Sequence, residues 1–353
     1  MNIATILRST GLLLLAALIA GTAAGAAPAH SDMQVLHRWT LGGAGGWDYL
    51  TLDASGERLF LSRATHVDVV NTETGKVIGT IANTLGVHGI ALAEGLQRGY
   101  ASNGKADSVT VFDLRTLNVI REVKLAAHNP DAILYEPVGK HVFTFNGRSK
   151  DVTVLDASSL AVAATFAVPD KPEFAVDDGN GHIYVNIESE PGQIAVIDSR
   201  KLSVARIFPL PGCASPSGLA IDKVHRRLFS VCDGKTMAIT DADSGRQVAR
   251  VPIGEGPDAA AFDAQRGLAF SSNGDGTLTV VRQQSADRYV VQATVPTQRG
   301  ARTMALDAVS GKIYLVSADF EPPAAPTPEQ PHPRPVPTPD SFTVLVVGSR
   351  GLE

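Results

Sequence analysis

The chain has 353 residues, of which 44% are hydrophobic and 6% aromatic, and its formal net charge is -5. This length is sufficient for a large apolar core, either in two domains or in one long all-β unit. The negative charge argues against binding of duplex nucleic acid, because contact with the phosphate backbone needs a basic face.

Residues 1–26 have the pattern of an export signal. Arg8 precedes the apolar run of residues 11–21, and Ala24-Gly25-Ala26 fits an A-x-A cleavage site. The run is too short for a membrane anchor, no basic stop follows it, and no cysteine follows it to accept a lipid. Beyond this segment no apolar run approaches the roughly 18 residues of a membrane span. We therefore expect an exported, periplasmic protein without a membrane span, whose mature chain, residues 27–353, forms a single domain.

Residues 129–168 show the unit from which the rest of the chain is built. Four short apolar runs, AILY, HVFTF, VTVL and AVAATFAV, are separated by turn-forming groups rich in Gly, Pro, Asn and Asp. Four β-branched runs in about 40 residues are typical of the four-stranded antiparallel meander that forms one blade of a β-propeller.

Seven copies of this unit follow one another at a regular period. Their second residues are 40, 43, 42, 44, 41 and 44 positions apart. The copies start at Trp47-Asp48, Val87-His88, Pro130-Asp131, Pro172-Glu173, Pro216-Ser217, Pro257-Asp258 and Ala301-Arg302. The period predicts an all-β fold, a seven-bladed propeller of four-stranded antiparallel blades.

The seventh copy is interrupted and incomplete. Residues 319–340 form a proline-rich insertion after its second apolar run, and residues 341–347 then supply only a third strand. The missing fourth strand is available at the other end of the chain, in residues 33–41. We therefore predict that residues 33–41 pair with residues 341–347, because a blade completed from both termini closes the ring and leaves no open edge.

The two cysteines are expected to form a disulfide. Cys213 stands just before the first strand of the fifth copy and Cys232 at the end of its second strand. Antiparallel neighbours bring these ends together, and thiols usually pair in an oxidising compartment. A reactive thiol or a metal-binding pair is the alternative, although the chain has no C-x-x-C and no histidine beside either cysteine.

The repeated motifs resemble those of a known family. V-T-V-[FLI]-D, Y/F-x-S/F-N-G and D-x-x-[TS]-[GL]-x-V look like the repeats of YncE-like, or YVTN-repeat, seven-bladed propellers, and the resemblance covers residues 33–351. Its proline-rich interruption is similar to that of exported members. The resemblance implies architecture but no particular reaction.

Candidate site residues lie at the starts of the first strands, which line the channel of a propeller. The second residues of the seven copies should form a ring at one channel mouth, and those ring residues are Asp48, His88, Asp131, Glu173, Ser217, Asp258 and Arg302. The ends of the second strands should add an outer polar tier of Asn103, Asn146, Asn186, Cys232 and Asn273. The insertion rises on the same face, as a lid, a docking arm or a tolerated surface loop.

The ring residues of the first four copies, three carboxylates and one imidazole, suggest a site for a divalent ion. Crowded carboxylates raise one another's pKa or recruit a cation. Oxygen ligands with one imidazole suit calcium, manganese or zinc, which would be held by Asp48, His88, Asp131 and Glu173. The alternative is that these groups only solvate a water-filled channel.

Three functions follow from this arrangement. The first is a monomeric, non-catalytic binding protein for a small molecule or a protein partner at the channel mouth. The second is a metal-assisted hydrolase of the lactonase type, in which a metal-bound water beside Asp131 or Glu173 attacks an ester. This second function rests on analogy with similar propellers. A redox propeller with a cofactor comes last, because the chain has no haem-attachment motif.

Overall fold

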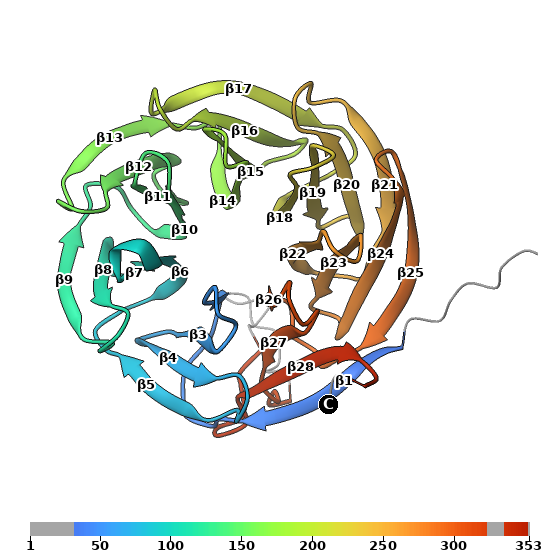
Figure 1. The fold of residues 1–353 in the computed structure, drawn as a ribbon, viewed down its shortest axis with the longest axis horizontal. Helices are drawn as coiled ribbons and strands as arrows, with labels where there is room; N and C mark the ends of the chain where they lie inside the picture. Colours follow the sequence, from blue (N-terminus) through green and yellow to red (C-terminus); the bar gives the residue numbers. More distant parts are fainter. Residues whose placement is uncertain (1–31, 323–334, 352–353) are drawn as a thin grey trace, which may run out of the picture.

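The computed structural model describes residues 32–322 and 335–351. Within these ranges the chain forms seven four-stranded antiparallel sheets arranged in a ring (Figure 1). The first strand of each sheet lies nearest the central channel and the fourth strand lies at the circumference (Figure 1). This confirms the predicted seven-bladed propeller. The predicted export signal, residues 1–26, lies outside the described residues.

The strands follow one another around the ring in chain order. Blade one consists of β2 (Leu50–Leu52), β3 (Arg58–Arg63), β4 (His66–Asn71) and β5 (Val77–Ile81). Blade two consists of β6 (Val87–Ala93), β7 (Arg98–Asn103), β8 (Ser108–Asp113) and β9 (Val119–Lys124). Blade three consists of β10 (Pro130–Glu136), β11 (His141–Asn146), β12 (Asp151–Asp156) and β13 (Val162–Ala167). A short 3-10 helix, η1 (Glu94–Leu96), connects β6 and β7.

Blades four to six repeat this order. Blade four consists of β14 (Lys171–Asp177), β15 (His182–Glu188), β16 (Gly192–Asp198) and β17 (Ser203–Leu210). Blade five consists of β18 (Pro216–Asp222), β19 (Arg227–Cys232), β20 (Thr236–Asp241) and β21 (Gln247–Pro252). Blade six consists of β22 (Pro257–Asp263), β23 (Leu268–Asn273), β24 (Thr277–Ser285) and β25 (Arg288–Pro296). No helix among the described residues is long and apolar enough to cross a membrane.

The seventh blade combines both ends of the described chain. It consists of β26 (Met304–Leu306), β27 (Ile313–Ser317), β28 (Thr343–Ser349) and β1 (Met33–Thr40). The register runs from Met33 opposite Ser349 to Thr40 opposite Thr343. The predicted pairing of residues 33–41 with residues 341–347 is confirmed, with the third strand extending two residues further.

The apolar core lies between the blades. The two middle strands of a blade are buried on both faces, as in β12, whereas the outer strand β13 alternates between exposed and half-buried side chains. Each buried cluster joins neighbouring blades: Phe143 and Phe145 of blade three, for example, share a cluster with Ile183 and Val185 of blade four. Stability of each blade therefore depends on its neighbours.

The described ends of the proline-rich insertion run side by side between β27 and β28. The Glu321 amide donates to the Val336 carbonyl at 2.8 Å, and the Thr338 amide donates to the Asp319 carbonyl at 2.7 Å. Phe320 also contacts Trp47, with ring centroids 6.1 Å apart. The insertion thus leaves and re-enters the blade through a short antiparallel pair beside the first blade.

The predicted disulfide is present. Cys213 and Cys232 are bonded, and their Cα atoms are 5.3 Å apart. Both side chains are buried. The bond ties the connection that precedes β18 to the end of β19.

Removing this disulfide is expected to destabilise the protein strongly. A closed loop with a sequence separation of 19 residues contributes about 3 kcal/mol by restricting the unfolded chain. The Cys213→Ala/Cys232→Ala variant should lose about this much unfolding free energy in urea titrations. Wild-type protein under dithiothreitol is the control and should lose a similar amount. Equal midpoints for the oxidised wild type and the double variant would contradict this expectation.

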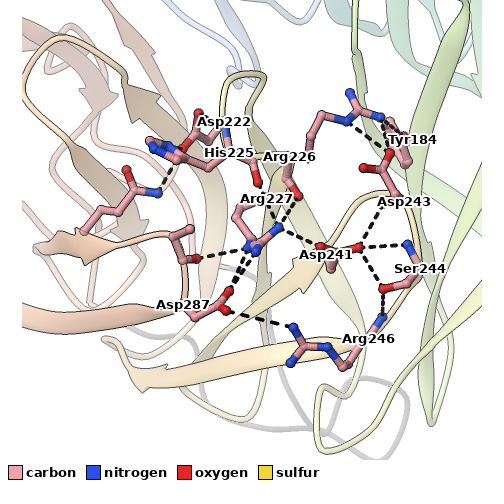
Figure 2. A network of polar contacts seen from close by, with 12 residues as sticks. Tyr184, Asp222, His225, Arg226, Arg227, Asp241, Asp243, Ser244, Arg246 and Asp287 are labelled. Carbon is pink, nitrogen blue, oxygen red and sulfur yellow. Dashed lines mark hydrogen bonds and ion pairs between the residues drawn. The ribbon is translucent and has the colours of Figure 1, made fainter.

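A network of ion pairs braces the face opposite the start of the first strands (Figure 2). Arg227, at the start of β19, donates to Asp241 and to Asp287, each at 2.7 Å. Arg226 pairs with Asp243 at 2.9 Å and donates to the Tyr184 hydroxyl at 2.9 Å. These contacts link β15 of blade four and the β24–β25 turn of blade six to blade five, so their role is to hold the blades together.

Candidate ligand-binding site at the channel mouth

Backbone bulges occur at the ring residues of five blades. In β6, β10, β14, β18 and β22 the pairing with the second strand is interrupted at the second residue of the repeat. A bulge releases a residue from the ladder and re-aims its side chain. The released residues are His88, Asp131, Glu173, Ser217 and Asp258. In the other two blades Asp48 and Arg302 stand two residues before β2 and β26.

Asp48, His88 and Asp131 converge, as the sequence predicted. His88 Nδ1 lies 2.5 Å from Asp48 Oδ2 and 3.6 Å from Asp131 Oδ1. One potential ligand atom from each residue lies within 4.8 Å of the other two. The three side chains are between 13% and 28% exposed, so solvent reaches them although they are largely enclosed.

His88 is held mainly by its carboxylate neighbours. Burial alone lowers the pKa of an imidazole, but the hydrogen bond with Asp48 and the charges of Asp131 and Asp48 outweigh burial, and the pKa of His88 is raised. Asp48 and Asp131 therefore favour a protonated imidazole of His88 between their two carboxyl groups. Any ligand that replaces this proton must carry positive charge.

Gly104 leaves the space that His88 occupies. A Cβ atom at Gly104 would lie 2.6 Å from His88 Nε2 and 2.8 Å from Asn129 Oδ1. Both distances are shorter than real Cβ contacts. The glycine that follows Asn103 therefore allows the imidazole and the Asn129 amide to pack against the β7–β8 turn.

Replacing Gly104 with alanine is expected to displace His88 while leaving the fold intact. The pKa of His88, followed by NMR of the imidazole, should fall toward its ordinary value because the contact with Asp48 is lost. Gly234→Ala is a matched control, since a Cβ there has no atom within 4 Å in the corresponding turn of blade five. An unchanged His88 pKa in Gly104→Ala would show that the imidazole is not held by this packing.

Glu173, predicted as a fourth metal ligand, is held by a lysine instead. Lys171 Nζ contacts Glu173 Oε1 and lies 2.5 Å from Glu188 Oε2. Burial lowers the pKa of Lys171, but the two carboxylates outweigh burial and raise it. Glu173 therefore belongs to a group with Lys171 and Glu188 next to Asp48, His88 and Asp131 and not to that triad.

Sequence reasoning missed Lys171 and Glu188, although a signal was present. The residue before the repeat motif is glycine in four copies, Gly46, Gly86, Gly256 and Gly300. Asn129 and Ser215 occupy this position in two other copies with positive φ angles of 56° and 44°. Lys171 departs from this small-residue pattern and places a cation in the ring.

Asp258 and Arg302 form the other side of the ring. Arg302 Nε lies 3.2 Å from Asp258 Oδ2, as expected if the arginine neutralises its neighbour. Ser217 is engaged elsewhere, because its hydroxyl donates to the Pro257 carbonyl at 3.0 Å. Ser217 therefore bridges blades five and six, and the ring carries its negative charge on the remaining positions.

Three of the ring carboxyl groups are difficult to ionise. Burial raises the pKa of Asp131 to about 6 and that of Asp258 to about 7. Burial and then the charge of Asp131 raise the pKa of Glu173 to about 9, and they outweigh Lys171, which lowers it. Each carboxylate opposes ionisation of the others because the site is shielded from water. The site would thus ionise more easily with a cation present.

Two aromatic side chains meet across the channel below the ring. Tyr49 follows Asp48 in blade one and Phe174 follows Glu173 in blade four, and their ring centroids are 5.3 Å apart. Tyr49 is only 8% exposed. Because they come from blades one and four, their contact narrows the channel, and we call this contact the floor of the site. We call the space bounded by this floor and by Asp48, His88, Asp131, Glu173 and Asp258 the acidic cup.

The Tyr49 hydroxyl faces the carboxylates of the acidic cup. Burial raises its pKa well above the usual value, and so do the charges of Asp131, Glu173, Asp48 and Asp258, in that order. No hydrogen bond joins this hydroxyl to another described residue. The hydroxyl is thus available to a ligand in the acidic cup, and the sequence offered no signal for it.

The asparagines expected in an outer tier lie inside the blades. All are completely buried, and they are Asn103, Asn146, Asn186 and Asn273. Asn103 Nδ2 donates to the hydroxyls of Ser108 and Thr110 at 3.1 and 2.8 Å, and Asn146 and Asn273 make similar bonds in their own blades. The amides thus tie the second strand to the third instead of facing the mouth.

Asn186 differs from the other asparagines by one register position. In blade four Ile187, and not Asn186, pairs with the first residue of the motif, Pro172. Asn186 Nδ2 instead donates to the carbonyls of Ser217 and Gly218, each at 3.0 Å. It therefore bridges blades four and five.

A cavity of about 980 Å³ adjoins the ring at Arg302. Its walls come from the glycine-rich connection before the first blade, the described ends of the proline-rich insertion and the sixth and seventh blades; they include Gly43, Trp47, Arg299, Arg302, Phe320 and Pro337. The glycine-rich residues 43–46 thus form a cavity wall at the mouth.

Sequence comparison relates the chain to YncE. No protein-family model matches it. The curated relatives that match include the uncharacterized protein YncE of Salmonella typhi and that of Salmonella typhimurium, each 24% identical over 212 residues. The match covers 58% of this chain and 59% of each relative, so it spans less than two thirds of their length. With the seven blades, this similarity confirms the resemblance to YncE-like propellers.

Solved structures confirm the fold at low sequence identity. Hydrazine synthase of Kuenenia stuttgartiensis matches with a TM-score of 0.68 and 18% identity over 76% of this chain and 92% of that chain. U3-55K matches with a TM-score of 0.70 and 10% identity over 89% and 98%. The RRP9 WD40 repeats match with a TM-score of 0.71 and 10% identity over 92% and 99%. Such similarity concerns architecture alone.

Proposed function

We propose that this chain is an exported binding protein that takes a small positively charged ligand into the acidic cup. The observation that carries the proposal is the crowding of five carboxyl groups at the mouth. Asp48, Asp131, Glu173, Glu188 and Asp258 lie together, and the pKa values of three of them, Asp131, Glu173 and Asp258, are raised even though Lys171, Arg302 and His88 are near. A cationic ligand would stabilise the ionised carboxylates.

The convergence of side chains at the acidic cup supports a small ligand. The carboxyl groups and the imidazole come from blades one to four and six, and the Tyr49–Phe174 contact narrows the channel beside them. Small molecules bind where a few polar groups converge. The Cys213–Cys232 disulfide supports export, because disulfides persist in oxidising compartments.

Thermal unfolding with different cations tests the proposal. The chloride salts of Zn²⁺, Mn²⁺, Ca²⁺, Mg²⁺ and spermidine are compared at constant ionic strength. At least one should raise the Tm, as expected when a ligand binds only the folded state, with about 2.7 kcal/mol gained at 100 times the Kd. In Glu173→Gln/Asp258→Asn, which removes two carboxylates from the acidic cup, this response should weaken.

Glu73→Gln/Glu122→Gln is the control for net charge, since both side chains lie on the exposed surface outside the acidic cup. It should respond like the wild type. Equal responses in the two double variants, or no cation that stabilises the wild type, would overturn the proposal. Metal-loaded protein should also leave a panel of lactones and esters unchanged; turnover that Asp131→Asn abolishes would favour the hydrolase instead.

A further inference from the structure

We propose that Asp48, His88 and Asp131 form a site for a divalent transition-metal ion, with Zn²⁺ or Mn²⁺ preferred to Ca²⁺. The inference rests on the proposed function and names the ligand class within the acidic cup. It assigns the metal to one side of that cup, apart from the Lys171 and Arg302 ion pairs.

The spacing of the three side chains suits one small ion. A tetrahedral metal with bonds of about 2.0–2.1 Å places its ligand atoms roughly 3.3 Å apart. His88 Nδ1 and Asp131 Oδ1 are already 3.6 Å apart, and Asp48 Oδ2 need withdraw from its 2.5 Å hydrogen bond by less than 1 Å. The adjustment is within the reach of side-chain rotation.

The positions of these residues are set by the backbone, which favours a prepared site. His88 and Asp131 stand at bulges of neighbouring blades, and the Ser102 hydroxyl of the His88 blade donates to the Asp131 carbonyl. The Thr303 hydroxyl donates to the Asp48 carbonyl at 2.8 Å. Each of the two carboxylate residues is therefore fixed by a hydroxyl from an adjacent blade.

An independent observation points to a bound species at the same place. The Tyr49 side chain is 8% exposed, and its hydroxyl has no hydrogen-bond partner among the described residues. Three protein ligands leave a coordination position open at a tetrahedral metal, which a water or a ligand atom takes. Such an atom would give the Tyr49 hydroxyl the partner that the protein itself does not supply.

The chemical types of the three ligating groups favour zinc or manganese over calcium. One imidazole and two carboxylates suit zinc or manganese, whereas calcium prefers six to eight oxygen ligands. Binding replaces the proton that His88 Nδ1 shares with Asp48 Oδ2, and this proton passes to the solvent. Metal binding should therefore release protons.

Metal titration of the full chain tests the inference. Protein stripped with EDTA is titrated calorimetrically with Zn²⁺, Mn²⁺ and Ca²⁺ in buffers of different ionisation enthalpy, and bound metal is counted by elemental analysis. One Zn²⁺ or Mn²⁺ per chain is expected, with proton release and weaker binding of Ca²⁺. His88→Gln and Asp131→Asn should each weaken binding at least about 100-fold, the upper range for loss of a supporting residue.

His128→Gln is the matched control. His128 Nδ1 lies 2.8 Å from Asp107 Oδ2, but this pair has one carboxylate and a histidine side chain that is 61% exposed. The control should keep wild-type affinity. Asp131→Asn should fold at least as stably as the wild type, because it removes a buried carboxyl with a raised pKa, so its loss of metal would not reflect unfolding.

The outcomes separate this inference from the proposed function. No tight Zn²⁺ or Mn²⁺ binding, equal loss in His128→Gln, or tighter binding of Ca²⁺ would overturn the metal site. Loss of metal only in Glu173→Gln/Asp258→Asn would also overturn it, while the proposed function stands. Stabilisation by spermidine alone would likewise overturn the metal site and leave the proposed function standing. Failure of every cation to stabilise the protein would overturn both.

Discussion

A chain that begins at Leu41 is expected to lose most of its stability. Without β1, the edge of β28 is unpaired and seven cross-strand pairs from Met33–Ser349 to Thr40–Thr343 are lost. Trp39 also leaves its contact with Tyr314, with ring centroids 6.0 Å apart. Trp39 is half-buried against the core between blades one and seven, so its loss costs part of the roughly 3–5 kcal/mol of a fully buried aromatic side chain. With the hydrogen bonds, the loss approaches the roughly 5–15 kcal/mol that holds a domain folded.

Urea titration followed by circular dichroism measures this loss. A chain that begins at Asp32 is the control and should unfold at the wild-type midpoint. A synthetic peptide of residues 32–41 should restore part of the stability of the shortened chain, because an open strand edge accepts an added strand. A shortened chain with the control's midpoint would show that β1 does not close the ring in solution.

The second large effect is expected from Asp258, whose burial makes its ionised form costly. The pKa of its carboxyl is about 7 in the folded protein and 3.8 without burial. The folded state thus binds more protons between these values, so the unfolding free energy falls as pH rises from about 4 to above 7. Asp258→Asn cannot ionise. In EDTA at pH 8.5 it should therefore be more stable than the wild type, by up to about 4 kcal/mol, with no difference at pH 4.

Chemical denaturation at pH 4 and pH 8.5 checks this prediction. Glu73→Gln, a surface change outside the acidic cup, should shift stability little at either pH. A less stable Asp258→Asn at pH 8.5 would mean that the ion pair with Arg302 outweighs the cost of burial. Intermediate pH values should show the difference growing through the window between 4 and 7.

The architecture was predictable because each blade repeats the same local pattern. Turn residues and apolar runs recur at one period, so the number of blades, the strand order and the closure by residues 33–41 follow from counting. The disulfide was predictable for the same reason, since Cys213 and Cys232 flank adjacent antiparallel strands. The ring residues Asp48, His88 and Asp131 could also be placed, because they share one motif position.

The site features that the sequence did not predict arise in two ways. Some residues depart from the repeat pattern, and one contact joins blades that are brought together only when the ring closes. Lys171 stands where other copies have small residues, and the extended β15 places Glu188 opposite it. Asn186 is shifted by one position, so the same residue type makes a different contact. The Tyr49–Phe174 contact spans three blade steps and depends on the width of the channel. A pattern local to one repeat contains no information about that distance.

The Tyr49–Phe174 floor makes the two faces of the propeller unequal for ligand entry and exit. Because Tyr49 and Phe174 meet across the channel, we expect a ligand to arrive and depart through the same opening. Both kinetic steps then share one route, and a macromolecule seated over that opening would slow both together. A macromolecule bound to the opposite face, where Arg226 and Arg227 connect the blades (Figure 2), would not cover this opening. Attaching the protein to a surface by that face should therefore leave exchange rates unchanged.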